Sequence, residues 1–208
     1  MIIKVLYYEN IKIEINILLY QQNPRIFTEC LDKCFSLLPK KIYQDSVNKI
    51  IIGFSKKLKG TNKTATYQDG TIYITEAFLG YEKPEKKLLK ELFHEMGHAF
   101  IYSFQDELFY DDKIYYDFYN LKNKVAQVIP DFQRFVKIHN DRQGVDNFIR
   151  NEYGEGEFHS KTIDFLPSPY TILEADEFIV YFFEEYYLRY KENVEKHNPV
   201  LYKILESL

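Results

Sequence analysis

The sequence has no excess of basic residues, no tryptophan and no long apolar run. Its formal net charge is −4, which argues against a general nucleic-acid-binding protein, because such proteins normally carry a basic patch or an overall basic balance. No stretch approaches the ~18 uncharged apolar residues that a membrane span requires, so we expect no membrane span. The 46% of hydrophobic and 28% of charged residues are typical of an ordinary soluble globular protein.

Cysteine is scarce as well, with only two in the chain. Cys30 and Cys34 lie four residues apart on an expected helix, so a redox pair or half of a metal site is one interpretation. A zinc cluster of this type needs four ligands, however. We therefore expect two reduced thiols in or near a core.

The N-terminus also lacks the features of a secretory signal. No small-residue cleavage site follows its apolar run, and the run itself is interrupted by Glu9, Lys12, Glu14 and Asn16. We therefore expect a cytoplasmic protein if Met1 is the native start.

No internal repeat and no low-complexity linker divides the 208 residues, a length that suits one domain with a sizeable core. We expect a single domain over 1–208, with a mainly strand-rich part over 1–80 and a mainly helical part over 81–208. Strands followed by helices predict the α+β class.

The strand-rich part contains two hairpin signals. Isoleucines alternate with polar residues from Ile11 to Ile17, and Glu9-Asn10 supplies a turn before them. Asp69-Gly70 is the strongest short-range hairpin signal in the chain. The predicted strand segments are a hairpin over 1–19, a short buried strand over 49–54, and a second hairpin formed by 64–68 and 71–75.

Apolar residues at helical spacing predict the helices. Pro84 stands where a helix can begin, Pro130 separates two helical stretches, and Gly154 and Gly156 predict a loop. The predicted helices are 25–38, 85–105, 115–129, 131–139, 173–191 and a short one after Pro199.

The helix over 85–105 contains His94-Glu95-Met96-Gly97-His98, which matches the HExxH pattern. Residues four apart on a helix lie roughly 40° apart around its axis, so both imidazoles point to one side and can share a tetrahedral ion. Glu95 can reach a water on that ion without binding the metal. The motif predicts one catalytic zinc and a hydrolysis in which Glu95 accepts the water's proton and returns it to the leaving amine.

Two histidines can also fall four apart by chance on a surface helix. The flanks argue against this, because the motif lies within an apolar helix and contains Gly97. Glycine costs about 1 kcal/mol relative to alanine in a helix interior. A glycine at this position is easier to explain if another backbone or a substrate approaches closely.

A catalytic zinc usually has a third protein ligand. The metzincin extension needs glycine at 101 and histidine at 104, and Ile101 and Phe104 exclude that class. A thermolysin-type ligand about twenty residues downstream would require Asp117 or a neighbour, in a helix rich in Tyr and Phe. The better candidates lie on the helix over 173–191.

Glu177 shares its helical face with Leu173, Val180 and Tyr181. An ionised carboxylate on such a face is costly unless it is paired or bound to a metal. A surface acid at the edge of the apolar stripe explains the periodicity equally well. The other acids that fit the same reasoning are Glu174, Asp176 and Glu184.

With these two helices side by side, the sequence resembles the lethal-factor-type zinc peptidases, the family of the anthrax lethal factor catalytic domain and the Pro-Pro endopeptidases. The matching segments are 94–99, 176–178, 186–188 and 198–199. The resemblance implies a small mixed sheet, a zincin active-site helix and a C-terminal helical part that carries the third ligand. It implies Glu177 as that ligand and Tyr170, seven residues earlier, as the oxyanion donor of a gluzincin-type endopeptidase.

The sequence departs from the family in two places. Tyr181 stands where the family has a carboxylate beyond the ligand, and Glu177 follows His98 by 79 positions, a longer connection than in the compact Pro-Pro endopeptidases. These departures concern specificity rather than chemistry. The resemblance covers roughly 70–205 and implies a substrate bound in extended form along an edge strand, for which 71–75 is the candidate.

We therefore expect a monomeric zinc endopeptidase that acts on an extended segment of a protein or peptide. A zinc-binding regulatory module without turnover is the alternative, and the presence of Glu95 argues against it. The missing signal favours a cytosolic regulatory peptidase, whereas the family's habit of secretion favours a toxin or surface-protein protease. His159, on the expected loop, is a weaker candidate for substrate contact, against a loop histidine with no role.

Overall fold

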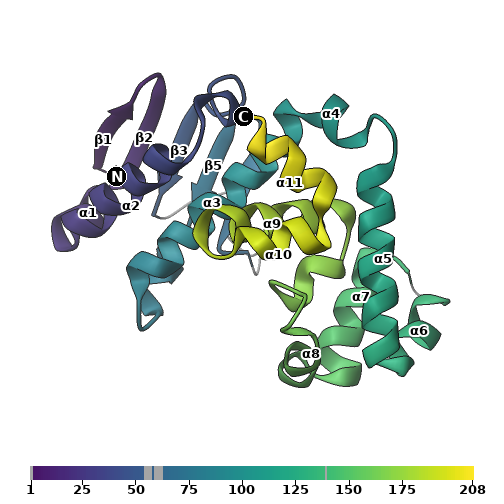
Figure 1. Ribbon diagram of the computed structural model, residues 1–208. Coiled ribbons are helices and arrows are strands. Elements are labelled where there is room, and N and C mark those ends of the chain that lie inside the picture. The colour runs from purple at the N-terminus through teal and green to yellow at the C-terminus, as the bar shows by residue number, and fades with distance from the viewer. Residues whose placement is uncertain (1, 54–57, 59–62, 139) are drawn as a thin grey trace. The chain divides into compact units, whose positions relative to one another are not determined.

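The computed structural model (Figure 1) describes residues 2–53, 58, 63–138 and 140–208. These residues form two compact units, an N-terminal unit that ends at Ser103 and a C-terminal unit that begins at Phe104. The described residues contain one mixed sheet and many helices, so the predicted α+β class is confirmed.

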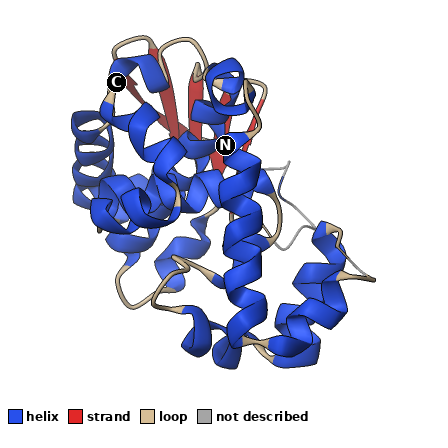
Figure 2. Cartoon of the chain, turned by 45° about the vertical axis from the view of Figure 1, so that its right-hand side comes forward, coloured by secondary structure: helices blue, strands red, loops and turns tan. Residues whose placement is uncertain are grey.

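The N-terminal unit contains the five-stranded sheet, whose strands are red in Figure 2, in the order β1-β2-β3-β5-β4. The two outer pairs are antiparallel, whereas β3 is parallel to both of its neighbours. The strands are β1 (Ile3–Tyr8), β2 (Ile11–Asn16), β3 (Lys49–Ile52), β4 (Ala65–Gln68) and β5 (Thr71–Ile74). Each predicted strand segment contains a strand, but the first hairpin ends at Asn16, because Ile17 begins helix α1 (Ile17–Gln22) with Asn16 as its N-cap. Residues 1 and 54 of the predicted segments lie outside the described residues.

Both predicted hairpins are formed. Tyr8 pairs with Ile11 across Glu9-Asn10, and Glu9 has a φ of 53°. Asp69 and Gly70 have φ values of 50° and 74°, which matches the two positive values of a type I′ hairpin turn. A Cβ at Gly70 would lie 2.7 Å from Nδ2 of Asn48, so a side chain there would displace Asn48 in addition to straining the backbone.

The prediction that 71–75 forms an edge strand is wrong. β5 pairs with β3 on one side and with β4 on the other, so its backbone groups are used within the sheet. The strands at the two ends of the described sheet are β1 and β4. The Asp69-Gly70 turn fixed the hairpin, but the order of its two strands depends on which one pairs with β3.

The core of the N-terminal unit lies between the sheet and the helices. Alternate residues of the three central strands point to the same face and are buried, and register places Ile13, Ile50 and Ile72 in one row. Helix α3 contacts β4, β5 and α2. The helical elements are α1 (Ile17–Gln22), α2 (Pro24–Leu37), η1 (Lys40–Ile42), η3 (Glu76–Gly80) and α3 (Pro84–Ser103).

The two cysteines lie on α2 and are both buried and unbonded to each other. Burial raises the pKa of the Cys30 thiol to about 11 and raises that of Cys34 further. Both are therefore protonated near neutral pH, and the expectation of reduced thiols in a core is confirmed.

The C-terminal unit is helical in its described residues and packs around phenylalanines. The ring of Phe178 contacts the rings of both Phe118 and Phe182, with centroids 5.5 Å and 5.2 Å away, respectively. The elements are α4 (Gln105–Phe109), α5 (Lys113–Val128), α6 (Pro130–Val136), α7 (Arg142–Asn147), the π-helical η4 (Phe148–Tyr153), α8 (Glu155–Thr162), η5 (Pro169–Ile172), α9 (Ala175–Leu188), α10 (Lys191–His197) and α11 (Pro199–Glu206).

The predicted loop around Gly154 and Gly156 is only partly correct. Gly154 has a φ of 94° and breaks the chain direction, as expected. Gly156, however, lies within α8, which also contains His159. This short helix carries charged and polar residues on most of its surface, so it lacks the apolar periodicity that would have predicted it. Among the described residues, no helix is long and apolar enough to cross a membrane.

Candidate metal centre

Helix α3 turns the HExxH histidines to one side, because its opposite side is strongly apolar and buried. Leu88, Leu92 and Phe100 are fully buried, and the carboxylate of Glu91, itself buried, accepts a hydrogen bond from Thr64 Oγ1 at 2.9 Å. These contacts fix the rotation of the helix against the sheet. They leave the imidazoles of His94 and His98 half-buried on one side, with ring centroids 5.2 Å apart and planes at 78°.

Glu95 is buried, with only 4% of its surface exposed. It follows His94 directly on α3, so it belongs to the same turn of the helix as the two histidines. Glu95 is therefore withdrawn from bulk solvent.

Helix α9 positions Glu177 in its first turn. Glu174 is the N-cap residue, and the next acids, Asp176 and Glu177, lie where the helix dipole favours negative charge. The turns that follow bury apolar side chains, so the helix is held from several sides. Glu177 is drawn into this packing and is 7% exposed, whereas Asp176 is exposed.

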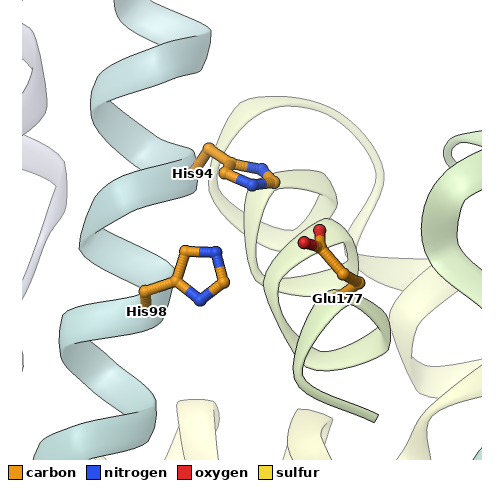
Figure 3. Close-up of side chains that lie close together, drawn as sticks. All are labelled: His94, His98 and Glu177. Atoms are coloured by element: carbon orange, nitrogen blue, oxygen red, sulfur yellow. The ribbon is translucent and has the colours of Figure 1, made fainter. Parts of the chain in front are cut away.

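His94, His98 and Glu177 converge in the structure (Figure 3). One ligand atom from each, an imidazole nitrogen from the two histidines and a carboxylate oxygen from Glu177, lies within 4.8 Å of the other two. Ligands at ~2.0–2.2 Å from a tetrahedral ion are about 3.3–3.6 Å apart, a contraction that small side-chain rotations can provide. The three residues therefore form a possible metal-binding triad.

The rival acids contribute no ligand atom to this group within the described part of the chain. Glu174 is 42% exposed at its side chain and pairs with Arg142, and Asp176 faces solvent. Glu184 is buried, with 6% of its surface exposed, but lies two turns further along α9.

Arg142 is a member of the site that the sequence did not predict. Its Nη2 donates to Oε1 of Glu177 at 2.9 Å, and its Nη1 forms a close ion pair with Glu174. Arg142 precedes Glu177 by 35 positions and lies in α7, a helix that we did not expect. No local pattern links the two residues, because their contact exists only in the tertiary structure.

Tyr170 lies in the short 3-10 helix η5, where Ser168 forms a capping box with Thr171. Its hydroxyl donates to Oε2 of Glu155 at 2.7 Å, and the guanidinium of Arg150 lies 5.0 Å from the centre of its ring. Burial and the hydrogen bond to Glu155 raise the pKa of Tyr170 well above its usual range. The hydroxyl therefore keeps its proton and remains a donor at any physiological pH.

Two further residues singled out from the sequence have clear surroundings. Burial raises the pKa of Tyr181 above its usual range, so its phenol is neutral. The zinc peptidases that the sequence resembles have a carboxylate at this position. His159 is half-buried on α8, and its Nδ1 has no hydrogen-bond partner among the described residues. His159 is not part of the metal-binding triad.

Comparisons of the chain with protein families, with curated proteins and with solved structures found no match in any of the three.

Proposed function

We propose that this protein is a zinc-dependent endopeptidase whose metal is held by His94, His98 and Glu177. The observation that supports the proposal most is the convergence of the two HExxH histidines with one buried carboxylate, all with ligand atoms within 4.8 Å. If the two histidines lay four apart only by chance on a surface helix, a carboxylate from a distant part of the sequence would not be expected to lie beside them.

The donor set favours zinc over harder cations. Two imidazole nitrogens and one carboxylate oxygen make the His₂Glu set of catalytic zinc sites, which leave a fourth position for water or substrate. Magnesium and calcium prefer sites made only of oxygen. A bound zinc ion would supply Lewis acidity, making the attacking water more acidic and polarising the carbonyl of the scissile bond.

The protein's own residues would carry the proton and the charge. Glu95 accepts the proton of the attacking water and delivers it to the leaving nitrogen, so the amine departs neutral. Tyr170 donates its hydroxyl proton in a hydrogen bond to the oxyanion that develops in the transition state. For this, the Tyr170 hydroxyl must leave Glu155 Oε2, which it contacts in the present structure.

An extended substrate requires a strand with one free side. β4, at the end of the described sheet, takes this role in the proposal in place of β5. Backbone hydrogen bonds to an edge strand distinguish little between substrate sequences. A preference for particular substrate side chains would therefore arise elsewhere. The substrate in this proposal is a protein or peptide, and the enzyme is a monomer.

A library digest tests the proposed function. The purified protein is incubated with a peptide library that includes proline-rich sequences, alone, with a zinc chelator, and with chelator followed by excess zinc. We expect cleavage that the chelator abolishes and zinc restores. Cleavage that survives full removal of the metal would contradict the proposal, and zinc binding without any cleavage would favour a regulatory module.

A further inference from the structure

The guanidinium of Arg142 bridges two carboxylates on the first turn of α9. Nη2 lies 2.9 Å from Oε1 of Glu177, and Nη1 pairs closely with Glu174, three residues earlier. The Glu177 side chain is only 9% exposed, whereas that of Glu174 is 42% exposed. One arginine therefore joins a buried acid to an exposed one.

The position of Arg142 is itself fixed by its helix. Asp141 caps α7 by accepting a hydrogen bond from the backbone N–H of Gly144 at 2.6 Å. Val145 is fully buried, and α7 continues into η4, where Ile149 is also fully buried. A residue at the first position of a helix anchored in this way has a defined backbone, so its fork can orient another side chain.

The bridge joins one guanidinium to two carboxylates. Glu174 offsets the formal charge of Arg142, so the pair presents a hydrogen-bond donor to Glu177 without adding net positive charge. A metal ion nearby is then repelled less than it would be by an isolated guanidinium.

The hydrogen bond to Arg142 restricts the rotation of the Glu177 carboxylate. Nη2 donates to Oε1 at 2.9 Å, so this oxygen is held in place. A carboxylate oxygen that accepts one hydrogen bond keeps a second lone pair, so the bond can orient the ligand without blocking a metal.

We infer that Arg142 is a positioning residue, which holds the carboxylate of Glu177 in the orientation in which it binds the metal. The inference rests on the proposed function, since it concerns the same metal. It adds that Arg142 and Glu174 act together as the outer support of the ligand. Outer partners of this kind typically change metal affinity by about 10–100-fold.

The test compares three variants of the full chain. Arg142→Ala removes the support, and Arg142→Lys keeps the charge but not the fork and serves if the alanine variant does not fold. Arg189→Ala is the matched control. It removes an arginine of similar exposure, 53% against 46%, that pairs with Glu185 at the other end of α9.

Zinc affinity is measured by competition with a chromophoric chelator, and the visible spectrum of the cobalt-substituted protein reports coordination. We expect zinc affinity to fall about 10–100-fold in Arg142→Ala and by less in Arg142→Lys, with no change in Arg189→Ala. The cobalt spectrum should change in Arg142→Ala, because Glu177 is no longer held in one orientation.

The outcomes separate the two proposals. If the wild type binds neither zinc nor cobalt, the proposed function fails and the inference with it. If the wild type binds zinc and Arg142→Ala binds it equally or more tightly with an unchanged cobalt spectrum, only the role of Arg142 is overturned. A loss of stability in the metal-free variant with unchanged affinity and spectrum would likewise reduce Arg142 to a structural role.

Discussion

Glu177 is a carboxylate in a place that disfavours an unpaired charge. It is 7% exposed, and its Oε1 accepts a hydrogen bond from the guanidinium of Arg142. Burying an ionised carboxylate without compensation is strongly unfavourable. A cation on its second oxygen would add compensation, which is why burial and metal binding are compatible at this residue.

Exchange of Glu177 should therefore empty the site. We expect Glu177→Ala to weaken zinc binding on the order of 100-fold or more, because it removes a ligand rather than an outer partner. Asp176→Ala is the matched control, one residue earlier on the same turn, and should bind zinc as the wild type does; so should Glu184→Ala. Calorimetric titration with zinc decides, and a site emptied by either control but not by Glu177→Ala would identify a different ligand.

Tyr170 allows a test of the transition state alone. In the proposed mechanism Tyr170 donates to the developing oxyanion, so Tyr170→Phe should lower kcat on the order of 10²–10³-fold. KM and zinc content should change little, since neither depends on that bond. Glu155→Gln is informative beside it, because it weakens the acceptor that holds the hydroxyl in the present structure. Turnover of Tyr170→Phe at the wild-type rate would remove Tyr170 from the mechanism.

At this scale the sequence predicted the histidine pair well and the acid less well. Two histidines four apart are a local pattern, and the helix alone brings them together. Periodicity could not distinguish Glu177 from the other acids of α9, since all lie within three turns of one helix. The spacing between Tyr170 and Glu177, which matches the family that the sequence resembles, favoured Glu177. No local sequence pattern indicated Arg142.

At the scale of elements, turn residues were the most informative part of the sequence. Asp69 and Gly70 both have the positive φ values that a type I′ turn needs, and Glu9-Asn10 forms the other predicted turn with a positive φ at Glu9. The edge position of 71–75 was predicted wrongly, because strand order depends on the parallel pairing of β3 with β5. β3 and β5 are separated in the sequence, and no local residue pattern indicates that they pair with each other.

Short polar helices were the elements most often missed. α8 and α10 are eight and seven residues long and carry few apolar side chains. These helices form because neighbouring elements bury one or two of their apolar side chains, such as Val194 of α10. Isolated helices of this length are unstable in water, so no local propensity could have predicted them.

The contact of α10 with α5 has a testable dependence on pH. Nδ1 of His197 lies 3.0 Å from Lys124 Nζ, and burial, Lys124 and Lys196 lower the pKa of His197 to about 4. The unfolded chain, with an ordinary histidine pKa of about 6.5, therefore takes up a proton that the folded chain refuses between pH 6.5 and 4. Stability should be fully present above about pH 6.5 and fall with pH through this window.

Urea unfolding of the wild type and of His197→Gln at several pH values measures this effect. Glutamine can still accept from Lys124 but does not titrate. We expect the variant to gain relative to the wild type on the order of 2–3 kcal/mol as pH falls from 7 to 4. A stability difference that stays constant across this range would show that His197 does not resist protonation.

For the whole molecule, the central claim is that the chain holds zinc in order to hydrolyse peptide bonds. The two halves of that claim can be separated, because in the proposed mechanism Glu95 moves the proton and does not bind the metal. Substituting it should stop the chemistry without emptying the site. Neither the charge of −4 nor the two buried thiols bear on this distinction.

The most direct test is zinc content and turnover measured together in wild type and Glu95→Ala, both prepared without chelator or a metal-affinity tag. The substrate is the best peptide from the library digest. We expect about one zinc per chain in both proteins and turnover reduced at least 10²–10⁴-fold in Glu95→Ala, the usual contribution of a general base. A Glu95→Ala protein that cleaves like the wild type, or a wild type that contains no zinc and takes up none, would contradict the account.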